Sequence, residues 1–108
     1  MVEYKTQQLN HVFHALADPT RREMLQRIAI QPCSVSKLAE PYDLSLNAIS
    51  KHLKVLEQAH LVKRIRKGRM HYFVFNQQAL TEASALMTQL QEYWNERLNA
   101  LEEYFKSI

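Results

Sequence analysis

Four polar side chains recur at helical spacing near the middle of the chain: Asn47, Lys51, Lys54 and Gln58. Their spacing is i, i+4, i+7 and i+11, so a single helix would carry all four on the face opposite its apolar residues. Asparagine can bind the edge of an adenine through two hydrogen bonds, and lysine can donate to guanine or to a phosphate. A polar face of this kind is often only solvated surface, so both interpretations stay open at this point.

A run of basic residues follows this helix along the chain. Five positive charges and no negative ones fall within residues 63–69, namely Lys63, Arg64, Arg66, Lys67 and Arg69. At the tip of a hairpin these side chains would have no acidic neighbour to pair with, so we expect them to contact phosphates or a minor groove. Together, the polar face and the basic run favour nucleic-acid binding over a merely solvated surface.

Composition and charge fit one small domain with a basic middle region. The chain has 108 residues, 46% of them hydrophobic and 23% charged, which is the size of a single domain. Residues 19–72 hold eleven of the fourteen Lys and Arg against four acids, whereas residues 73–108 hold five Glu against two basic residues. The single cysteine cannot form an internal disulfide, and no apolar run is long enough for a membrane span. Because the start also lacks the pattern of a signal peptide, a cytoplasmic protein is predicted.

Two helices are predicted before residue 32. Apolar residues at i, i+3, i+4 and i+7 mark the first helix, which ends near Ala17. Asp18 can cap the second helix by accepting a free amide hydrogen, and Pro19 fits its first position, where no N–H is needed. Gln31-Pro32 ends the second helix. The apolar positions of the two helices are Leu9, Val12, Phe13 and Leu16, then Met24, Leu25 and Ile28.

The next two helices are predicted to form a helix-turn-helix within residues 34–59. Either Ser34 or Ser36 can cap the first, which must stop by Glu40 because Pro41 disfavours helical geometry in the residue before it. After a turn over 41–44, Ser45 caps the second, which carries the polar face. Such a pair places its second helix in a DNA major groove. The side chains expected to face inward from that helix are Leu46, Ile49, Leu53 and Leu56.

A β-hairpin is predicted over residues 61–75. Residues 61–66 and 70–75 are rich in branched and aromatic types, which favours strands. Lys67-Gly68-Arg69 links them, and this glycine, the only one in the chain, can supply the positive φ of a tight turn. The hairpin would be the wing of a winged helix-turn-helix, with the basic run at its tip.

The last predicted helix, 77–108, contains neither Pro nor Gly and has an apolar residue at every third or fourth position. This apolar stripe is longer than a three-helix head can cover. Part of it, around Leu90, Trp94, Leu98 and Leu101, is therefore predicted to be a dimer face. A helix folded back on its own domain would show the same periodicity and is the alternative.

Other chemistry finds little support in the sequence. There is no Gly-rich phosphate loop, no Cys paired with a placed His and no carboxylate pair in a plausible cleft, which argues against an enzyme. His11 and His14 lie at i and i+3 without a further ligand nearby, so no metal site is predicted. Cys33 is expected to be a small buried residue, with a redox role as the weaker hypothesis. The basic surface could instead bind an acidic protein, because winged helices also serve as interaction modules.

Three segments resemble the ArsR-type repressors, the arsenical-resistance and metal-sensor family of winged helix-turn-helix regulators. They are residues 14–25 (HALADPTRREML), 45–56 (SLNAISKHLKVL) and 68–73 (GRMHYF), so the resemblance spans nearly the whole chain. It implies a homodimer built on the first and last helices, with the fourth helix on DNA. It also implies DNA contacts from Ser50 and His52, in addition to Asn47, Ala48 and Lys51.

The chain departs from the metal-sensing members of that family at both of their usual sites. Ser34 and Ser36 stand where those members have a Cys-x-Cys pair, and hydroxyls are poor ligands for thiophilic ions. From Gln77 onward there is no His, Cys or Asp. The chain thus resembles a metal-independent branch of the family. The pattern Trp94-x-x-Arg97-Leu98-x-x-Leu101-Glu102 also resembles that branch. Neither a metal nor a cofactor is therefore expected.

The sequence therefore predicts a single mainly α domain over residues 1–108, a winged helix-turn-helix of order α-α-α-α-β-β-α that dimerises through 1–17 and 77–108. Its expected function is that of a homodimeric repressor on an inverted-repeat operator in double-stranded DNA, without a metal inducer, and repression of its own operon is a hypothesis by analogy. The predicted DNA contacts are Ser45, Asn47, Ala48, Ser50, Lys51, His52, Lys54, Arg66, Lys67 and Arg69. The predicted dimer contacts are Leu9, Val12, Phe13, Leu90, Trp94, Leu98 and Leu101.

Overall fold

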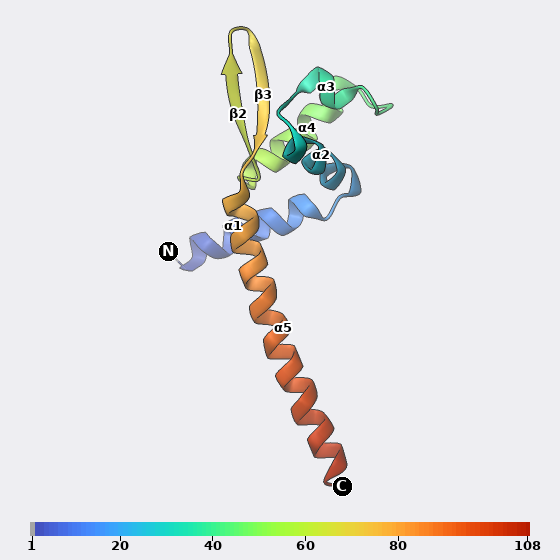
Figure 1. Ribbon diagram of the computed structural model, residues 1–108, viewed down its shortest axis with the longest axis vertical. Coiled ribbons are helices and arrows are strands. Elements are labelled where there is room, and N and C mark those ends of the chain that lie inside the picture. Colours follow the sequence, from blue (N-terminus) through green and yellow to red (C-terminus); the bar gives the residue numbers. More distant parts are fainter. Residues whose placement is uncertain (1) are drawn as a thin grey trace.

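The computed structural model describes the backbone of residues 2–108 and the side chains of residues 5–108 (Figure 1). Met1, the first residue of the predicted dimerisation segment, lies outside the described residues. The elements are α1 (Val2–Leu16), α2 (Pro19–Ile30), β1 (Cys33–Ser34), α3 (Val35–Ala39), α4 (Leu46–Gln58), β2 (Val62–Lys67), β3 (Met70–Phe75) and α5 (Gln77–Lys106). Within that part of the chain, none of the helices combines the length and the apolar character that a membrane span requires.

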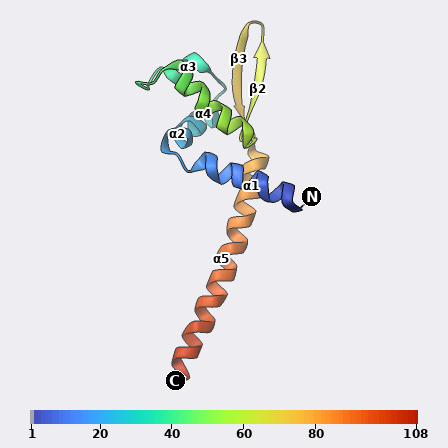
Figure 2. The same ribbon diagram turned by 180° about the vertical axis from the view of Figure 1, so that it is seen from behind.

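Helix α5 projects from a compact head formed by the other elements (Figures 1 and 2). Its 30 residues make a helix about 45 Å long, and only the first turns pack on the head, where Ala79 and Ala83 are 5% and 3% exposed. The Cα radius of gyration is 18.6 Å, well above the ~13 Å of a compact domain of this length. The alternative in which this helix folds back on its own domain is therefore not the arrangement found.

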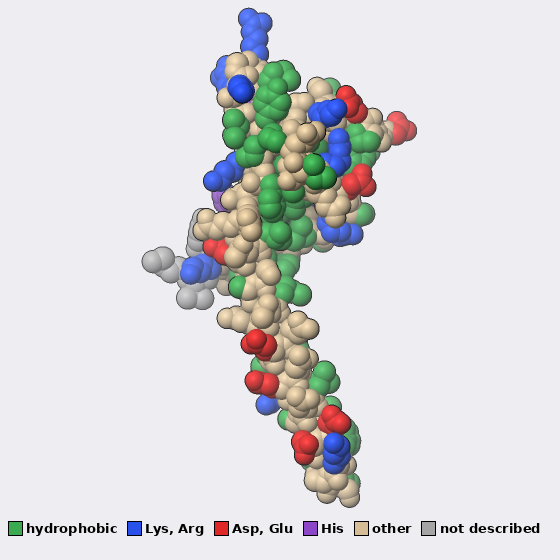
Figure 3. All heavy atoms as spheres, viewed as in Figure 1, with side chains coloured by type: hydrophobic (Ala, Val, Ile, Leu, Met, Phe, Trp, Pro, Cys, Tyr) green, Lys and Arg blue, Asp and Glu red, His purple; other side chains and the backbone are tan. Residues whose placement is uncertain are grey.

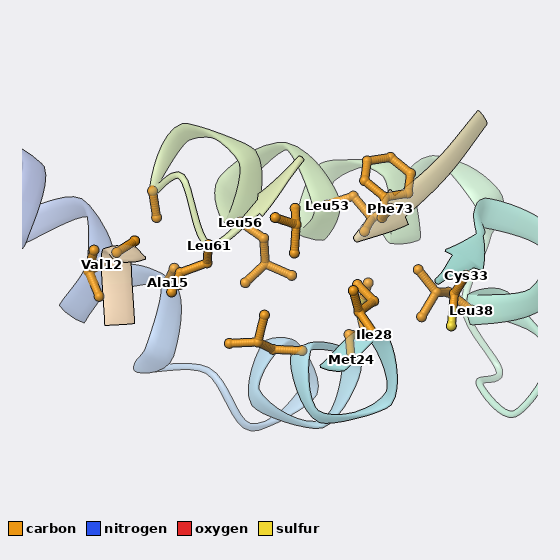
Figure 4. Close-up of a cluster of buried hydrophobic side chains, with 14 of the residues drawn as sticks. Val12, Ala15, Met24, Ile28, Cys33, Leu38, Leu53, Leu56, Leu61 and Phe73 are labelled. Atoms are coloured by element: carbon orange, nitrogen blue, oxygen red, sulfur yellow. The ribbon is translucent and has the colours of Figure 1, made fainter. Parts of the chain in front are cut away.

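The core of the head lies between α2, α4 and β3 (Figure 4). Met24 and Ile28 of α2 face Leu53 and Leu56 of α4, and Phe73 of β3 packs on the same cluster. All five side chains are at most 2% exposed. The apolar periodicities of the second and fourth predicted helices thus identified their inward faces correctly, with one exception.

That exception is Leu46, which was expected to face inward from α4 and is 59% exposed. It is the first residue of the helix and follows an exposed turn in which Asp43, Leu44 and Ser45 are all accessible. The first turn of α4 therefore extends past the elements that cover Ile49, which is fully buried. The prediction of Leu46 as a core residue was wrong. Helical periodicity gives the direction in which a side chain points, but it does not show how far along the helix the neighbouring elements extend to cover it.

The three strands form one antiparallel sheet in the order β1-β3-β2. In the hairpin Lys67 pairs with Met70, so the turn consists of Gly68 and Arg69 alone, with Gly68 at φ +64°. The predicted three-residue link is therefore one residue shorter. Strand β1, which pairs Cys33 with Phe73, was not predicted because two residues are too few to show an alternating pattern.

The start of α2 follows the predicted cap. The Asp18 carboxylate accepts a hydrogen bond from the Arg21 backbone N–H at 3.0 Å, and Pro19 occupies the first turn. This backbone hydrogen bond is the main reason that the pKa of Asp18 lies below its ordinary value, and the nearby Arg21 and His52 charges lower it further against a partial desolvation.

Replacing Asp18 with Ala is expected to lower the free energy of unfolding by about 1 kcal/mol at neutral pH, because an N-cap is removed. Since the folded pKa is depressed, the carboxylate contributes fully above the unfolded value of about 3.9, and this contribution is lost as the pH falls through the folded value. Urea denaturation of wild type and Asp18→Ala should therefore give stabilities that converge below about pH 3.9. Asp18→Asn keeps a neutral cap and should lack this pH dependence, and a constant gap between wild type and Asp18→Ala would contradict the assignment.

Candidate nucleic-acid interface

Helix α4 is held with its polar face outward. Its N-cap is Ser45, whose hydroxyl oxygen accepts the Ala48 N–H at 3.1 Å. The buried residues Ile49, Leu53 and Leu56 fix the rotation of the helix. As a result, the predicted stripe is exposed along its whole length; its members are Asn47, Lys51, Lys54 and Gln58.

The remaining predicted contacts of α4 lie beside this stripe. Ser50 is exposed, whereas Ala48 and His52 are half-buried at the edge between the polar and apolar faces. Ser45 is exposed, but its hydroxyl oxygen is engaged in the cap. The half-buried position of His52 agrees with its expected place near the edge of the apolar face.

The preceding helix, α3, forms the first half of the helix-turn-helix and is capped by Ser34, whose hydroxyl accepts the Lys37 N–H at 3.2 Å. Of the two candidate caps, Ser34 is therefore the one used, and Ser36 is exposed inside the helix. The helix ends at Ala39, one residue before the limit set by Pro41.

The wing carries its basic residues on an extended, exposed hairpin (Figure 3). Arg66, Lys67 and Arg69 are all exposed at or beside the turn. The Arg66 Nε–H donates to the Gly68 carbonyl at 3.2 Å, which leaves the guanidinium charge without an acidic partner among the described residues. On the face that Figure 3 shows, the tip of the wing carries Lys and Arg side chains without acidic ones, whereas acidic side chains lie along α5 and on part of the head.

One member of the basic run is paired locally, contrary to the sequence prediction. Arg64 Nη2 lies 2.9 Å from Glu57 Oε1 of α4, and its guanidinium stacks 5.1 Å from the centre of the Phe73 ring. Glu57 and Arg64 are seven positions apart, across the turn between α4 and β2, where neither helical nor strand spacing would pair them. The Arg64 side chain is 48% exposed and that of Glu57 is 29% exposed. Because solvent screens such a pair, it adds at most about 1 kcal/mol to stability. The pair connects strand β2 of the wing to helix α4.

Helix α5 exposes the predicted apolar stripe. Leu90, Trp94, Leu98 and Leu101 are 41%, 58%, 62% and 50% exposed. The stripe continues in both directions along the helix and beyond its end, through Met87, Phe105 and Ile108, which belong to the predicted apolar periodicity but not to the predicted dimer contacts. Met87, Trp94, Leu101 and Ile108 follow one another at a spacing of seven, which keeps them on one side of the helix. A stripe of this size is far more than a surface helix of a monomer normally exposes.

The dimer candidates of α1 divide into two groups. Leu9 and Phe13 are half-buried at the edge of the core and keep accessible surface. Val12 is 1% exposed and packs inside the core of its own subunit. It therefore has no surface to offer a partner, and its prediction as a dimer contact was wrong because the apolar face of α1 is first covered by the head.

Comparisons with known proteins agree with this geometry. Residues 16–65 match the model of a helix-turn-helix domain family. The chain is similar to the transcriptional repressor SdpR of Bacillus subtilis, with 35% identity over 75 residues that cover 69% of this chain and 83% of SdpR. It is also similar to the crystal structure of an ArsR family transcriptional regulator, RHA00566, with a TM-score of 0.77 and 37% identity over 83% of this chain and 93% of that one. This chain belongs to the ArsR family.

The fold of the family is shared by a further neighbour. The homodimeric winged helix-turn-helix DNA-binding domain of Mb0332 from Mycobacterium bovis matches with a TM-score of 0.64 and 25% identity, over 89% of this chain and 86% of that one. As members of the ArsR family are DNA-binding transcriptional regulators, the chain is a DNA-binding regulator rather than an enzyme. Its α4 and wing correspond to the DNA-binding part of a winged helix-turn-helix.

In the part of this ArsR-family chain that the structure describes, metal-ligand residues do not gather. Among the residues that the structure describes, no three His, Cys, Asp or Glu side chains are placed to hold a metal ion. Ser34 uses its hydroxyl as a helix cap, and Cys33 is 4% exposed with its thiol donating to the Gln31 carbonyl at 3.2 Å. The thiol is therefore a buried structural group, as expected.

Proposed function

We propose that this ArsR-family regulator is a homodimeric repressor that binds an inverted-repeat operator and has no metal inducer. The observation that carries the proposal is the exposed polar face of α4 together with a basic wing whose tip residues Arg66, Lys67 and Arg69 have no acidic partner among the described residues, on a subunit whose last helix exposes a long apolar stripe. The polar face and the basic wing suit a DNA duplex. The apolar stripe of the last helix suits a second copy of the same chain. Repression would follow because a bound dimer blocks RNA polymerase.

On DNA, α4 of each subunit would lie in the major groove. Asn47 would bind an adenine edge through two hydrogen bonds, while Lys51 and Lys54 would donate to guanine or phosphate. Ala48 is small enough to let the helix approach a thymine methyl. Ser45, Ser50 and His52 would add contacts at the edge of the groove. The wing would hold the backbone or enter a minor groove through the residues Arg66, Lys67 and Arg69.

The dimer would form through α1 and α5. Support comes from the exposed stripe of α5 with Leu90, Trp94, Leu98 and Leu101, and from the accessible parts of Leu9 and Phe13. The similar domain of Mb0332 is a homodimer. A two-fold axis would place the two α4 helices about one DNA turn, ~10 bp, apart, which predicts an inverted repeat.

The proposal of a metal-free mechanism rests on the residues at the two family metal sites. In the third helix the candidate ligands are hydroxyls, and the Ser34 hydroxyl is already used as a cap. In α5 the available carboxylates are Glu side chains without any His or Cys. A thiophilic or borderline ion would find no suitable ligand set at either place.

Fluorescence anisotropy on the DNA upstream of the coding region tests this function and the hypothesis of autoregulation together. The fragment is compared with scrambled DNA of equal length and composition, from about 50 to about 200 mM salt. We expect at least ~10³-fold tighter binding to the upstream fragment, with affinity that falls steeply as salt rises.

Equal and weak binding to both fragments would contradict autoregulation. Selection from a random duplex library would then decide the wider proposal, because an inverted repeat should be enriched if the operator lies elsewhere. If no sequence is enriched, the repressor function fails, and the interaction module that binds an acidic protein partner takes its place.

A further inference from the structure

The guanidinium of Arg21 connects three helices at the base of the polar face of α4. Arg21 lies in the first turn of α2, and its Nε–H donates to the Ala15 carbonyl at 2.9 Å. Its Nη2 donates to the His14 carbonyl, also at 2.9 Å, so two of its nitrogens cap the end of α1. The third nitrogen, Nη1, lies 3.4 Å from Nδ1 of His52 on α4. The backbone of Arg21 is itself fixed through the Asp18 cap.

This arrangement determines which nitrogen of His52 can carry the proton. A guanidinium has only N–H donors and keeps its charge at every pH at which proteins fold, so it cannot accept a hydrogen bond from the ring. A hydrogen bond across this 3.4 Å contact therefore requires Nδ1 of His52 to be the acceptor. A neutral imidazole with Nδ1 as acceptor has its proton on Nε2, on the far edge of the ring.

We propose that Arg21 is a positioning residue for DNA recognition, which holds His52 as the Nε2–H tautomer and so presents a hydrogen-bond donor to the DNA. The inference rests on the proposed function, since it assigns a partner to a predicted DNA contact. Phosphate oxygens and the acceptor edge of guanine are the groups that such a donor can bind. Arg21 itself is half-buried and needs no contact with DNA to act in this way.

The link also joins the end of α1 to α4. Arg21 holds the last carbonyls of α1 with one side of its guanidinium and His52 with the other. Helix α1 is one of the two helices proposed to form the dimer. The position of the His52 ring therefore depends on how α1 ends, which couples the dimer helices to the DNA-binding helix through one side chain.

The first test needs no DNA, and its main result comes from the wild-type protein. Long-range ¹H–¹⁵N correlation spectra of the histidine rings report which nitrogen is protonated, and His52→Gln identifies the His52 signal. We expect the Nε2–H tautomer for His52 at neutral pH in the wild-type protein, and Arg21→Ala should replace it with a mixture of tautomers. A proton on Nδ1 in the wild type would overturn the proposal at once.

Arg22→Ala is the matched control. Arg22 is in the same turn of α2 and also holds the end of α1, with Nη1 donating to the Leu16 carbonyl at 2.7 Å, but it makes no contact with His52. Its loss should leave the His52 tautomer unchanged. If Arg22→Ala changes the His52 spectrum as much as Arg21→Ala does, the effect comes from the end of α1 and the assignment to Arg21 is wrong.

A double-mutant cycle on operator DNA tests whether the contact between Arg21 and His52 contributes to DNA affinity. We expect Arg21→Ala and His52→Ala each to weaken binding by about tenfold, from the loss of one modest hydrogen bond in each subunit of the dimer, and the double variant to bind no more weakly than either. Arg21→Ala should cost less than about twofold in a His52→Gln background, because the Gln amide carries its own donor. Additive losses would overturn the positioning role. Failure of the wild type to prefer any DNA sequence would instead contradict the proposed function, while the spectra would still test the Arg21–His52 contact.

Discussion

Leu98→Asp is expected to convert the proposed dimer to a monomer and to lower the affinity for the operator by at least about 10²-fold. Leu98 is 62% exposed near the middle of the apolar stripe of α5, between Trp94 and Leu101. In a dimer built on this stripe, a carboxylate at this position would be buried twice, once from each subunit. The desolvation of an unpaired charge costs several kcal/mol, and each 1.4 kcal/mol is a factor of ten in the dissociation constant.

Sedimentation velocity at micromolar concentration measures the change from dimer to monomer. Fluorescence anisotropy on operator DNA measures the loss of affinity. The head should remain folded in Leu98→Asp, because α5 contacts the head only through its first turns and Leu98 lies far beyond Ala83. Circular dichroism and urea denaturation check this point. Loss of operator binding would then follow from loss of the second α4 helix rather than from unfolding.

Asn99→Asp is the control for the added charge. It places the same carboxylate one residue further along α5, on the side of the helix away from the apolar stripe. We expect this variant to remain a dimer with nearly unchanged affinity for DNA. If Leu98→Asp also remains a dimer, the stripe is not the subunit interface, and the proposal of dimerisation through α5 has to be abandoned.

The parts of this fold that could be predicted from the sequence are those that local chemistry determines. Asp18 and Ser45 begin α2 and α4 because an Asp or Ser oxygen satisfies a free amide at a helix start, whatever lies elsewhere in the chain. The periodic positions Ile49, Leu53 and Leu56 face the core for an equally local reason. These features together fix the outward face of α4, so the exposed polar stripe was predicted in full.

Contacts between residues far apart in the sequence could not be predicted in the same way. Arg64 was expected to be free, yet it pairs with Glu57, because the angle between α4 and the wing brings them together. Arg21 and His52 are 31 positions apart and meet only through the packing of α2 on α4. No spacing rule connects such pairs, and their partners follow only from the tertiary arrangement.

Val12 and Leu46 illustrate a second kind of limit. Both belong to correctly predicted apolar faces, but Val12 is covered by its own head and Leu46 by nothing in the described part of the chain. Periodicity gives the side of a helix that is apolar, and the lengths and positions of neighbouring helices decide what covers each turn. The same reasoning explains why α5 can be buried at Ala83 and open at Leu98 along one continuous stripe.

Asn47→Ala is expected to weaken operator binding by about 2–6 kcal/mol per dimer, or roughly 30-fold to 10⁴-fold, because each subunit loses one bidentate contact worth about 1–3 kcal/mol. Asn47 is exposed next to the N-cap of α4, and Ala favours the helix more than Asn does, so the fold should be unaffected. Binding to scrambled DNA should change little, since the amide carries no charge.

Arg69→Ala provides the comparison that separates base recognition from backbone contact. Loss of a phosphate-binding guanidinium should weaken binding to operator and scrambled DNA alike, and should reduce the slope of log K against log salt by about 1 per subunit. Asn47→Ala should leave that slope unchanged and relax the preference for one base pair in each half-site. The two variants would then lose affinity for different reasons. Equal losses on operator and scrambled DNA for Asn47→Ala would mean that α4 binds the DNA backbone, and sequence preference would have to come from the wing or from DNA shape.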